Sequence, residues 1–258
     1  MKLEGKKIAV LVADEYEDLE LWYPILRMKE EGAEVMVVAS DNVEKDTCYS
    51  KHGYEVDIDK KAAEVDPSSF DAVIIPGGWA PDKIRRCQNT LNLIREMNED
   101  GKVIASICHG GWVLSSADII EGKTVTSTVG IKDDLEHAGA HWIDNEVVID
   151  GNLITSRAPA DLPEFSKAII FALSNKVCVV CGTKHEDIKE GAFYCVNCQT
   201  YYCPECAEEN DLRMNSHEKL KRKKQVERKR SKKLESTSSL DEYKRNICPE
   251  CGSMMGLY

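Results

Sequence analysis

The chain has 258 residues, with 34 Lys or Arg against 45 Asp or Glu, and this length suffices for one α/β domain and a smaller second domain. From residue 175 onward there are 16 basic and 13 acidic residues, which leaves 18 basic and 32 acidic residues before it. The acidic first part is therefore unsuited to nucleic-acid binding by bulk charge, whereas the mildly basic second part permits it. No apolar run approaches the roughly 20 residues that span a bilayer, and the first residues do not resemble a signal peptide. We expect a cytoplasmic protein without a membrane partner.

Strand-like and helix-like segments alternate through the first two thirds of the chain. A strand is expected at residues 8–12, followed by a helix over 19–31 with apolar positions at Leu19, Trp22 and Leu26. Further strands are expected at 35–39, 72–75 and 103–107, helices at 91–97 and 161–173, and a hairpin over 147–155 that turns at Asp150-Gly151. This pattern predicts an α/β fold over residues 1–174, with a flavodoxin-like, mainly parallel sheet sandwiched by helices.

The most informative segment places Cys108 where the strand ending at Ile107 turns sharply into a helix. In a nucleophile elbow, such a strained turn lifts a nucleophilic side chain clear of the sheet, and small residues after it let the helix pack closely. A helix N-terminus also favours a thiolate over a thiol. We therefore expect a nucleophilic Cys108 that titrates well below the free thiol value of about 8.5. The alternative is a small core residue.

Three loops should converge at the carboxyl ends of the strands, where open parallel sheets bind ligands. They contain residues 14–18, 77–78 and 108. A catalytic thiolate needs a proton acceptor, a charge partner and donors for an oxyanion. We assign His109 as the acid or base, Glu17 as the group beside the thiolate, and the backbone N–H groups of Gly78 and His109 as an oxyanion hole. The alternative for Glu17 is an acidic residue that complements the helix dipole.

Six motifs together resemble the PfpI/ThiJ family, the intracellular protease I-like members of the class I glutamine amidotransferase-like superfamily. They are Glu17-Asp18, Gly53 within Lys51-His52-Gly53-Tyr54, Phe70-Asp71-Ala72 leading to Pro76-Gly77-Gly78, Cys108-His109-Gly110, Ile131-Lys132-Asp133-Asp134, and Ser156-Arg157 followed by Asp161. The resemblance covers about residues 6–173 and does not extend to the segment from residue 175.

This resemblance implies a role for each site residue. Cys108 would be the nucleophile, His109 its partner and Glu17 the hydrogen-bonded carboxylate that stabilises the thiolate. A carboxylate from a neighbouring subunit would orient His109, and Asp82 occupies that position, where the family usually has Glu. The enzyme would then be a homo-oligomer, a dimer or a trimer of dimers. Trp79 and Gly111 stand where Arg and Pro are expected.

The resemblance also implies an activity, a cysteine-dependent attack on a carbonyl carbon with no cofactor at the catalytic site. We interpret the protein as an intracellular peptidase-like hydrolase. The alternatives are a glyoxalase or deglycase that acts on reactive aldehydes, and a non-enzymatic redox sensor or zinc adaptor. The substrate would be a peptide or a small carbonyl compound.

Eight of the eleven cysteines form four Cys-x-x-Cys pairs in the last third of the chain. They are Cys178, Cys181, Cys195, Cys198, Cys203, Cys206, Cys248 and Cys251. Eight thiolates suffice for two closed tetrahedral zinc sites, so we expect a small zinc-binding domain over residues 175–258 that holds two structural ions. The spacing resembles a cross-brace module of FYVE or RING-related type, and two sequential zinc ribbons are the alternative.

A basic insert separates the third cysteine pair from the fourth, at about residues 211–235. Its core, Arg213 to Lys233, contains eleven Lys or Arg against two Glu. This composition is typical of a charged helix, which either keeps the insert soluble or binds nucleic acid or an acidic protein through its charge.

Deletion of residues 213–233 tests the basic insert. If the insert binds nucleic acid, binding should weaken steeply as salt is raised, and the deletion should abolish it. The measurement is a fluorescence titration with labelled RNA and DNA at several salt concentrations. Unchanged binding after the deletion would exclude the insert as the binding element.

Overall fold

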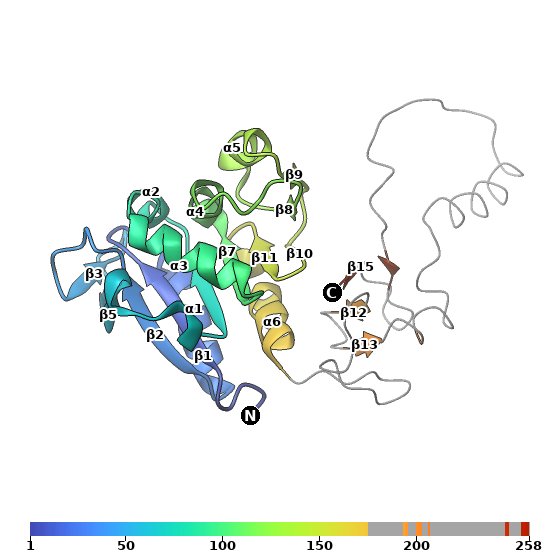
Figure 1. The fold of residues 1–258 in the computed structure, drawn as a ribbon, viewed down its shortest axis with the longest axis horizontal. Helices are drawn as coiled ribbons and strands as arrows, with labels where there is room; N and C mark the ends of the chain where they lie inside the picture. The colour runs from blue at the N-terminus through green and yellow to red at the C-terminus, as the bar shows by residue number, and fades with distance from the viewer. Residues whose placement is uncertain (175–192, 196–199, 203–205, 207–245, 248–253, 258) are drawn as a thin grey trace, which may run out of the picture. The chain divides into compact units, whose positions relative to one another are not determined.

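The structure is a computed structural model that describes residues 1–174, 193–195, 200–202, 206, 246–247 and 254–257. The chain divides into two compact units, Met1–Asn175 and Lys176–Tyr258. Figure 1 shows the first unit as a sheet with helices around it.

The first unit contains a seven-stranded sheet in the order β10-β11-β7-β6-β1-β2-β5. Its strands are β1 (Lys7–Val12), β2 (Glu34–Ala39), β5 (Lys60–Lys61), β6 (Ala72–Ile75), β7 (Val103–Ile107), β10 (Val147–Asp150) and β11 (Leu153–Ser156). All neighbours pair in parallel except β10 and β11, which form an antiparallel hairpin. The five longer parallel strands follow the order 2-1-3-4-5 that is typical of flavodoxin-like sheets.

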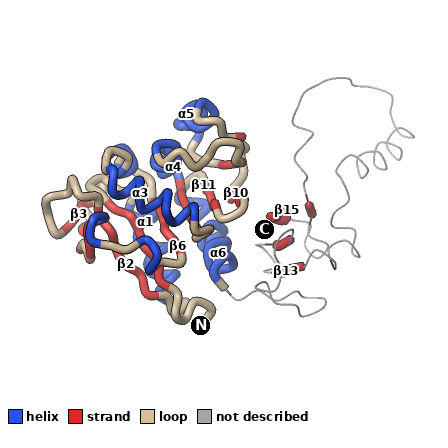
Figure 2. The backbone as a smooth tube through the Cα atoms, viewed as in Figure 1, coloured by secondary structure: helices blue, strands red, loops and turns tan. Residues whose placement is uncertain are grey.

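Six helices and two small ladders complete this unit. The helices are α1 (Asp18–Glu30), α2 (Ala80–Ile84), α3 (Gln88–Glu99), α4 (Gly111–Ser116), α5 (Lys132–His137) and α6 (Leu162–Leu173). The ladders join β3 (Thr47–Tyr49) to β4 (Glu55–Asp57) and β8 (Thr124–Val125) to β9 (His141–Trp142). Figure 2 shows the helices distributed around the central strands.

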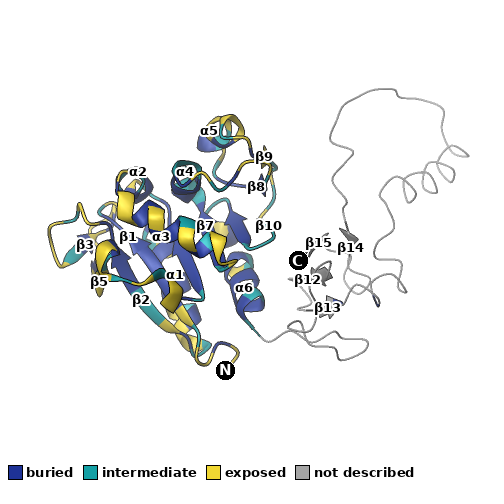
Figure 3. Ribbon diagram, viewed as in Figure 1, coloured by how far each residue is buried: buried dark blue, intermediate teal, exposed yellow. Residues whose placement is uncertain are grey.

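Both faces of the central sheet are covered. Every residue of β6 and β7, and all of β1 after Lys7, is buried, although successive side chains point to opposite faces. Figure 3 shows these strands as the buried centre of the unit. Helices α1 and α6 pack against each other, and α2 and α3 each contact α4. A mainly parallel α/β sheet with helices on both sides, as expected from the alternating pattern, is therefore confirmed.

The buried face of α1 differs from the sequence-based expectation. Leu19 and Leu26, expected on the apolar face, are 57% and 61% exposed. The residues that pack inward are instead Glu20, Leu21, Pro24, Ile25 and Met28. The spacing of Leu21, Ile25 and Met28 fits a helical stripe as well as the expected one does, and tertiary packing decides between them. Glu20 is consequently carried into the interior.

The second unit contains a four-stranded sheet in the order β13-β12-β15-β14. Its strands are β12 (Phe193–Cys195), β13 (Thr200–Tyr202), β14 (Asn246–Ile247) and β15 (Met254–Leu257). Of the eight cysteines expected to bind zinc, Cys195 ends β12 and Cys206 is buried, and the other six lie outside the described residues. The basic insert also lies outside them, so the zinc module and the insert stay predictions. Within the described residues, no helix is long and apolar enough to cross a membrane.

Candidate active site

The turn after β7 presents Cys108 in a strained conformation. The residue has a φ of 60°, in the left-handed region that non-glycine residues rarely adopt. A single 3-10 turn (Cys108–Gly110) connects it to α4. β7 fixes the entry to this turn because all its residues are buried. The predicted strand-to-helix elbow at Cys108 is therefore present.

The loop after β6 approaches Cys108 so closely that it has no room for a side chain. At Gly77, a Cβ atom would collide with the Glu20 carboxylate and with the Cys108 Cβ. At Gly78, whose φ is 77°, a Cβ would meet the backbone of residues 15–17. Two glycines in sequence therefore allow three chain segments to converge beneath the thiol.

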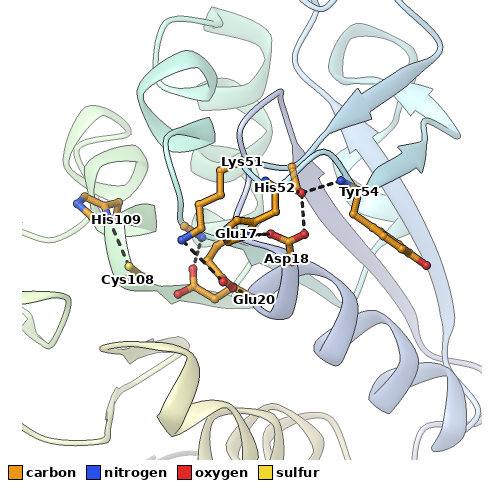
Figure 4. Close-up of polar contacts among 10 residues, drawn as sticks. Glu17, Asp18, Glu20, Lys51, His52, Tyr54, Cys108 and His109 are labelled. Atoms are coloured by element: carbon orange, nitrogen blue, oxygen red, sulfur yellow. Dashed lines mark hydrogen bonds and ion pairs between the residues drawn. The ribbon is translucent and has the colours of Figure 1, made fainter.

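The carboxylate that contacts Cys108 belongs to Glu20 and not to Glu17. Glu20 is fully buried, and its Oε2 accepts a hydrogen bond of 2.8 Å from the Gly77 N–H. Its side chain also forms a hydrogen bond with the Cys108 thiol. Glu17 instead caps α1, since its Oε2 accepts a 2.9 Å hydrogen bond from the Glu20 N–H. The expected acidic residue at the helix start thus has a capping role, and a carboxylate three residues later lies at the nucleophile (Figure 4).

Lys51 brings a positive charge to the same region. Its Nζ lies 3.9 Å from the Glu17 carboxylate, and its side chain extends toward Glu17 in Figure 4. The turn that carries Lys51 is fixed from both sides, because Asp18 accepts a 2.6 Å hydrogen bond from Ser50 Oγ and lies 2.7 Å from His52 Nδ1. A rigid turn therefore places an ammonium group beside the acidic residues of the site.

Glu20 is buried and Cys108 is half-buried, and each of these two acids affects the pKa of the other. Burial, and then the charge of Glu17, raises the pKa of Glu20 from 4.5 to about 7. Burial, and then the charge of Glu20, raises the pKa of Cys108 to about 12. This direction is opposite to the expected low thiol pKa, because desolvation and a neighbouring carboxylate outweigh the nearby helix N-terminus. Protonation of Glu20 removes its negative charge, which is the second cause of the raised pKa of Cys108.

His109 lies beside the sulfur, as expected. Its Nδ1 is 3.3 Å from Cys108 Sγ. Burial, and then the positive charge of Lys51, lowers the pKa of His109, which favours the neutral imidazole. The His109 ring also contacts two indoles, with centroids 5.6 Å away at Trp79 and 5.0 Å away at Trp112. A neutral imidazole at this position has one nitrogen able to accept the thiol proton.

The two backbone N–H groups assigned to an oxyanion hole converge on the nucleophile. Those of His109 and Gly78 both donate hydrogen bonds to the Cys108 sulfur and so favour a negative charge there. Asp82 lies on α2, where its carboxylate pairs with Arg86 of the same chain. Within the described residues, no group of three or more His, Cys, Asp or Glu side chains is placed to hold a metal ion.

The sequence contains a signal for Glu20. Glu20 lies on the helical stripe that also contains Leu21, Pro24 and Ile25, so an inward-facing α1 necessarily buries it. A carboxylate on a buried helix stripe is rarely tolerated without a function. Because Leu19 and Leu26 were expected on the inward face of the helix, Glu20 was not expected at the site.

Comparisons with known proteins agree with this geometry. Residues 6–172 match the model of the DJ-1/PfpI family. Over 156 residues, the chain is 49% identical to "Deglycase TK1284" of Thermococcus kodakarensis and 47% identical to "Deglycase PfpI" of Pyrococcus furiosus. Each of these matches covers 60% of this chain and 92% of the relative. A solved two-domain protein from Anabaena variabilis, with DJ-1/ThiJ/PfpI-like and ferritin-like domains, is 42% identical with a TM-score of 0.62. That match covers 64% of this chain and 47% of the other.

Glu20→Gln tests the buried carboxyl. Because the pKa of Glu20 is raised from 4.5 to about 7, the native state keeps a proton that the unfolded state has released between these pH values. The free energy of unfolding of the wild type should therefore fall as pH rises through this window, by up to about 3 kcal/mol. Glu20→Gln lacks this proton, so its free energy of unfolding should change less. Urea unfolding at pH steps from 4.5 to 8 measures both.

Cys108→Ser is the control for this experiment, since it keeps the buried carboxyl and should follow the wild-type curve. Parallel curves for the wild type and Glu20→Gln would contradict a raised pKa at Glu20.

Proposed function

Because the chain belongs to the DJ-1/PfpI family and is an enzyme, we propose that it acts on reactive aldehydes or their adducts as a glyoxalase or deglycase. One observation carries this proposal, the convergence of a buried carboxyl and two backbone N–H groups on the Cys108 thiol. The relatives named deglycases are similar to this chain over most of their own length. They support the deglycase alternative over the peptidase-like reading that the sequence analysis adopted.

Glu20 and Cys108 act as one proton-sharing pair in this proposal. When the proton lies on Glu20, the carboxylic O–H donates to a thiolate, and the single negative charge lies on sulfur. The N–H groups of His109 and Gly78 stabilise that charge. The pKa of Glu20, raised to about 7, leaves part of this carboxyl protonated at neutral pH. Because the pKa of Cys108 is raised to about 12, its thiol also needs a proton acceptor, and the neutral imidazole of His109 takes that role. A protonated Glu20 then places no second negative charge beside the thiolate.

The thiolate then adds to the aldehyde carbon of a 2-oxoaldehyde such as methylglyoxal. A carbon–sulfur bond forms, the carbonyl oxygen takes the electron pair and a proton, and a hemithioacetal results. His109 or Glu20 moves a proton from the first carbon to the second through an enediol, which leaves a thioester on Cys108. Water then cleaves the thioester and releases lactate and the thiol, so the net reaction is the addition of one water.

A homo-oligomer belongs to the same proposal. A carboxylate that reaches His109 from a neighbouring subunit would fix which imidazole nitrogen carries the proton. Asp82 is the candidate, and its carboxylate is 43% exposed on α2, where a second chain can reach it. The zinc module and basic insert are proposed to recruit an acidic partner or nucleic acid to this enzyme.

Cys108→Ser tests the proposed activity. The variant should lose turnover of methylglyoxal to lactate by roughly a thousandfold or more, because the bond-forming atom is gone. Lactate production and the cleavage of an unstructured protein are measured side by side. Cys87→Ser is the control because Cys87 is a free cysteine of the same unit whose thiol bonds to Asp41 and not to the site. Undiminished lactate production in Cys108→Ser, or protein cleavage without any lactate, would refute the proposal.

Mixed oligomers test the position of Asp82. Asp82→Ala and Cys108→Ser should each be slow or inactive alone. If Asp82 acts across the subunit interface, a mixed dimer of the two contains one intact site, and an equal mixture recovers about one quarter of wild-type activity. The control mixes Asp82→Ala with a double variant that carries both changes, which leaves no complete site. An equally inactive first mixture would show that Asp82 does not act in trans.

A further inference from the structure

Two tryptophans contact the ring of the proposed acid or base, and they come from different elements. Trp79 follows the Gly77-Gly78 loop, with its ring centroid 5.6 Å from that of His109 and an interplanar angle of 36°. Trp112 lies in the first turn of α4, with its ring centroid 5.0 Å from that of His109 and an interplanar angle of 53°. Both distances lie within the range over which aromatic rings attract each other. We call these two residues the tryptophan pair.

Trp112 is firmly anchored. Its indole N–H donates a 2.8 Å hydrogen bond to the Asp134 carboxylate. The guanidinium of Arg85 lies over its ring, 5.8 Å from the centroid, and Arg85 in turn donates a 2.8 Å hydrogen bond to Ser116 Oγ. An indole held at its edge and on its face offers the His109 ring a fixed surface.

Trp79 is anchored through its backbone and not through its indole. Its N–H donates a 2.8 Å hydrogen bond to the Glu15 carbonyl oxygen, and the residue is 55% exposed. An exposed tryptophan beside a nucleophile leaves apolar surface in water. The fold therefore retains this ring at the site although the ring adds little to the hydrophobic core.

We propose that Trp79 and Trp112 are positioning residues that keep His109 Nδ1 against the Cys108 sulfur. Rotation of the imidazole by half a turn about χ2 would replace Nδ1 by a carbon atom, and this torsion has only weak intrinsic preferences. Contacts with the two indoles hold the plane of the imidazole and oppose that rotation, and the 3.3 Å contact between Nδ1 and the sulfur favours the observed one of the two orientations. The indole N–H of Trp112 is already bonded to Asp134, so the pair acts through contact and exclusion of water.

The surroundings of the imidazole agree with this role. The titratable and charged groups around it are Cys108 and Glu20 beside the sulfur, Lys51 from the turn after β3, and Arg85 and Asp134 behind Trp112. Burial is the larger cause of the lowered pKa of His109, ahead of the Lys51 charge. A neutral imidazole with Nδ1 held at the thiol is ready to accept its proton.

The inference rests on the proposed roles of Cys108 and His109, and alkylation of Cys108 by iodoacetamide tests it without any substrate. Trp112→Leu should lower the alkylation rate about three- to tenfold, as expected from the loss of one aromatic contact. Trp112→Phe keeps a ring and should stay close to the wild type. Mass spectrometry of the peptide that contains Cys108 separates this thiol from the other cysteines.

The pH profile of alkylation gives a second readout. Removal of Trp79 or Trp112 admits water to the imidazole, which should raise the pKa of His109 toward its ordinary value. Since the neutral form accepts the thiol proton, the acid limb of the profile should move to higher pH in Trp79→Leu. A purely structural loosening would lower the rate without moving this limb.

Trp142→Leu is the matched control. Trp142 is anchored in the same way as Trp112, with its indole N–H on Ser127 Oγ at 3.0 Å and the Lys132 ammonium 5.3 Å from its ring centroid, but it lies on β9. The rate and the pH profile of Cys108 alkylation in Trp142→Leu should match those of the wild type. An equal loss in Trp142→Leu would overturn the proposal.

Wild-type alkylation in folded Trp79→Leu and Trp112→Leu would also overturn it. If Trp112→Leu does not fold, the result for Trp79→Leu, which changes an exposed residue, decides the test alone. Loss of alkylation without any lactate production in the wild type would uphold this inference while refuting the proposed activity.

Discussion

The candidate active site depends on one buried carboxylate. Glu20 reaches the Gly77 N–H and the Cys108 thiol from the inward face of α1, and an ionised carboxylate in such a place is costly unless it is hydrogen-bonded. The fold meets this requirement by bringing α1, the loop after β6 and the turn after β7 together at one edge of the sheet. Parallel pairing of β1, β6 and β7 makes that convergence unavoidable. Fold and site are thus consequences of the same strand order.

The same carboxylate separates this site from a simple helix-activated thiol. A helix terminus stabilises a thiolate with partial charges, whereas Glu20 can hold the proton that the thiolate lacks. Lys51 brings a positive charge to the acidic residues of the site, and His109 with its ring contacts lies beside the sulfur. In the proposed mechanism the site works through the placement of a few protons, and all its described parts lie within the first unit of the chain.

The sequence predicted the sheet strands that carry the site and the elbow at Cys108, because apolar runs, glycines and an isolated cysteine are local signals. Gly32 and Gly101, which follow α1 and α3, have the positive φ values that favour glycine at a helix end. The inward face of α1 could not be chosen from periodicity, since two stripes one residue apart fit equally well, and Glu20 was therefore not expected at the site. Glu17 was assigned to the thiol from its place after the first strand and from the family resemblance. The direction of the Cys108 pKa was also wrong, because desolvation depends on three-dimensional burial.

The absence of a side chain at Gly77 has a consequence for how this enzyme can diversify. Glu20, Cys108 and the backbone of His109 all crowd the space that a methyl group would need. A side chain at Gly77 would require all three groups to move, so this position is closed to substitution. Differences in reactivity among descendants of this chain should therefore arise at outer residues of the site, such as Trp79 and Lys51.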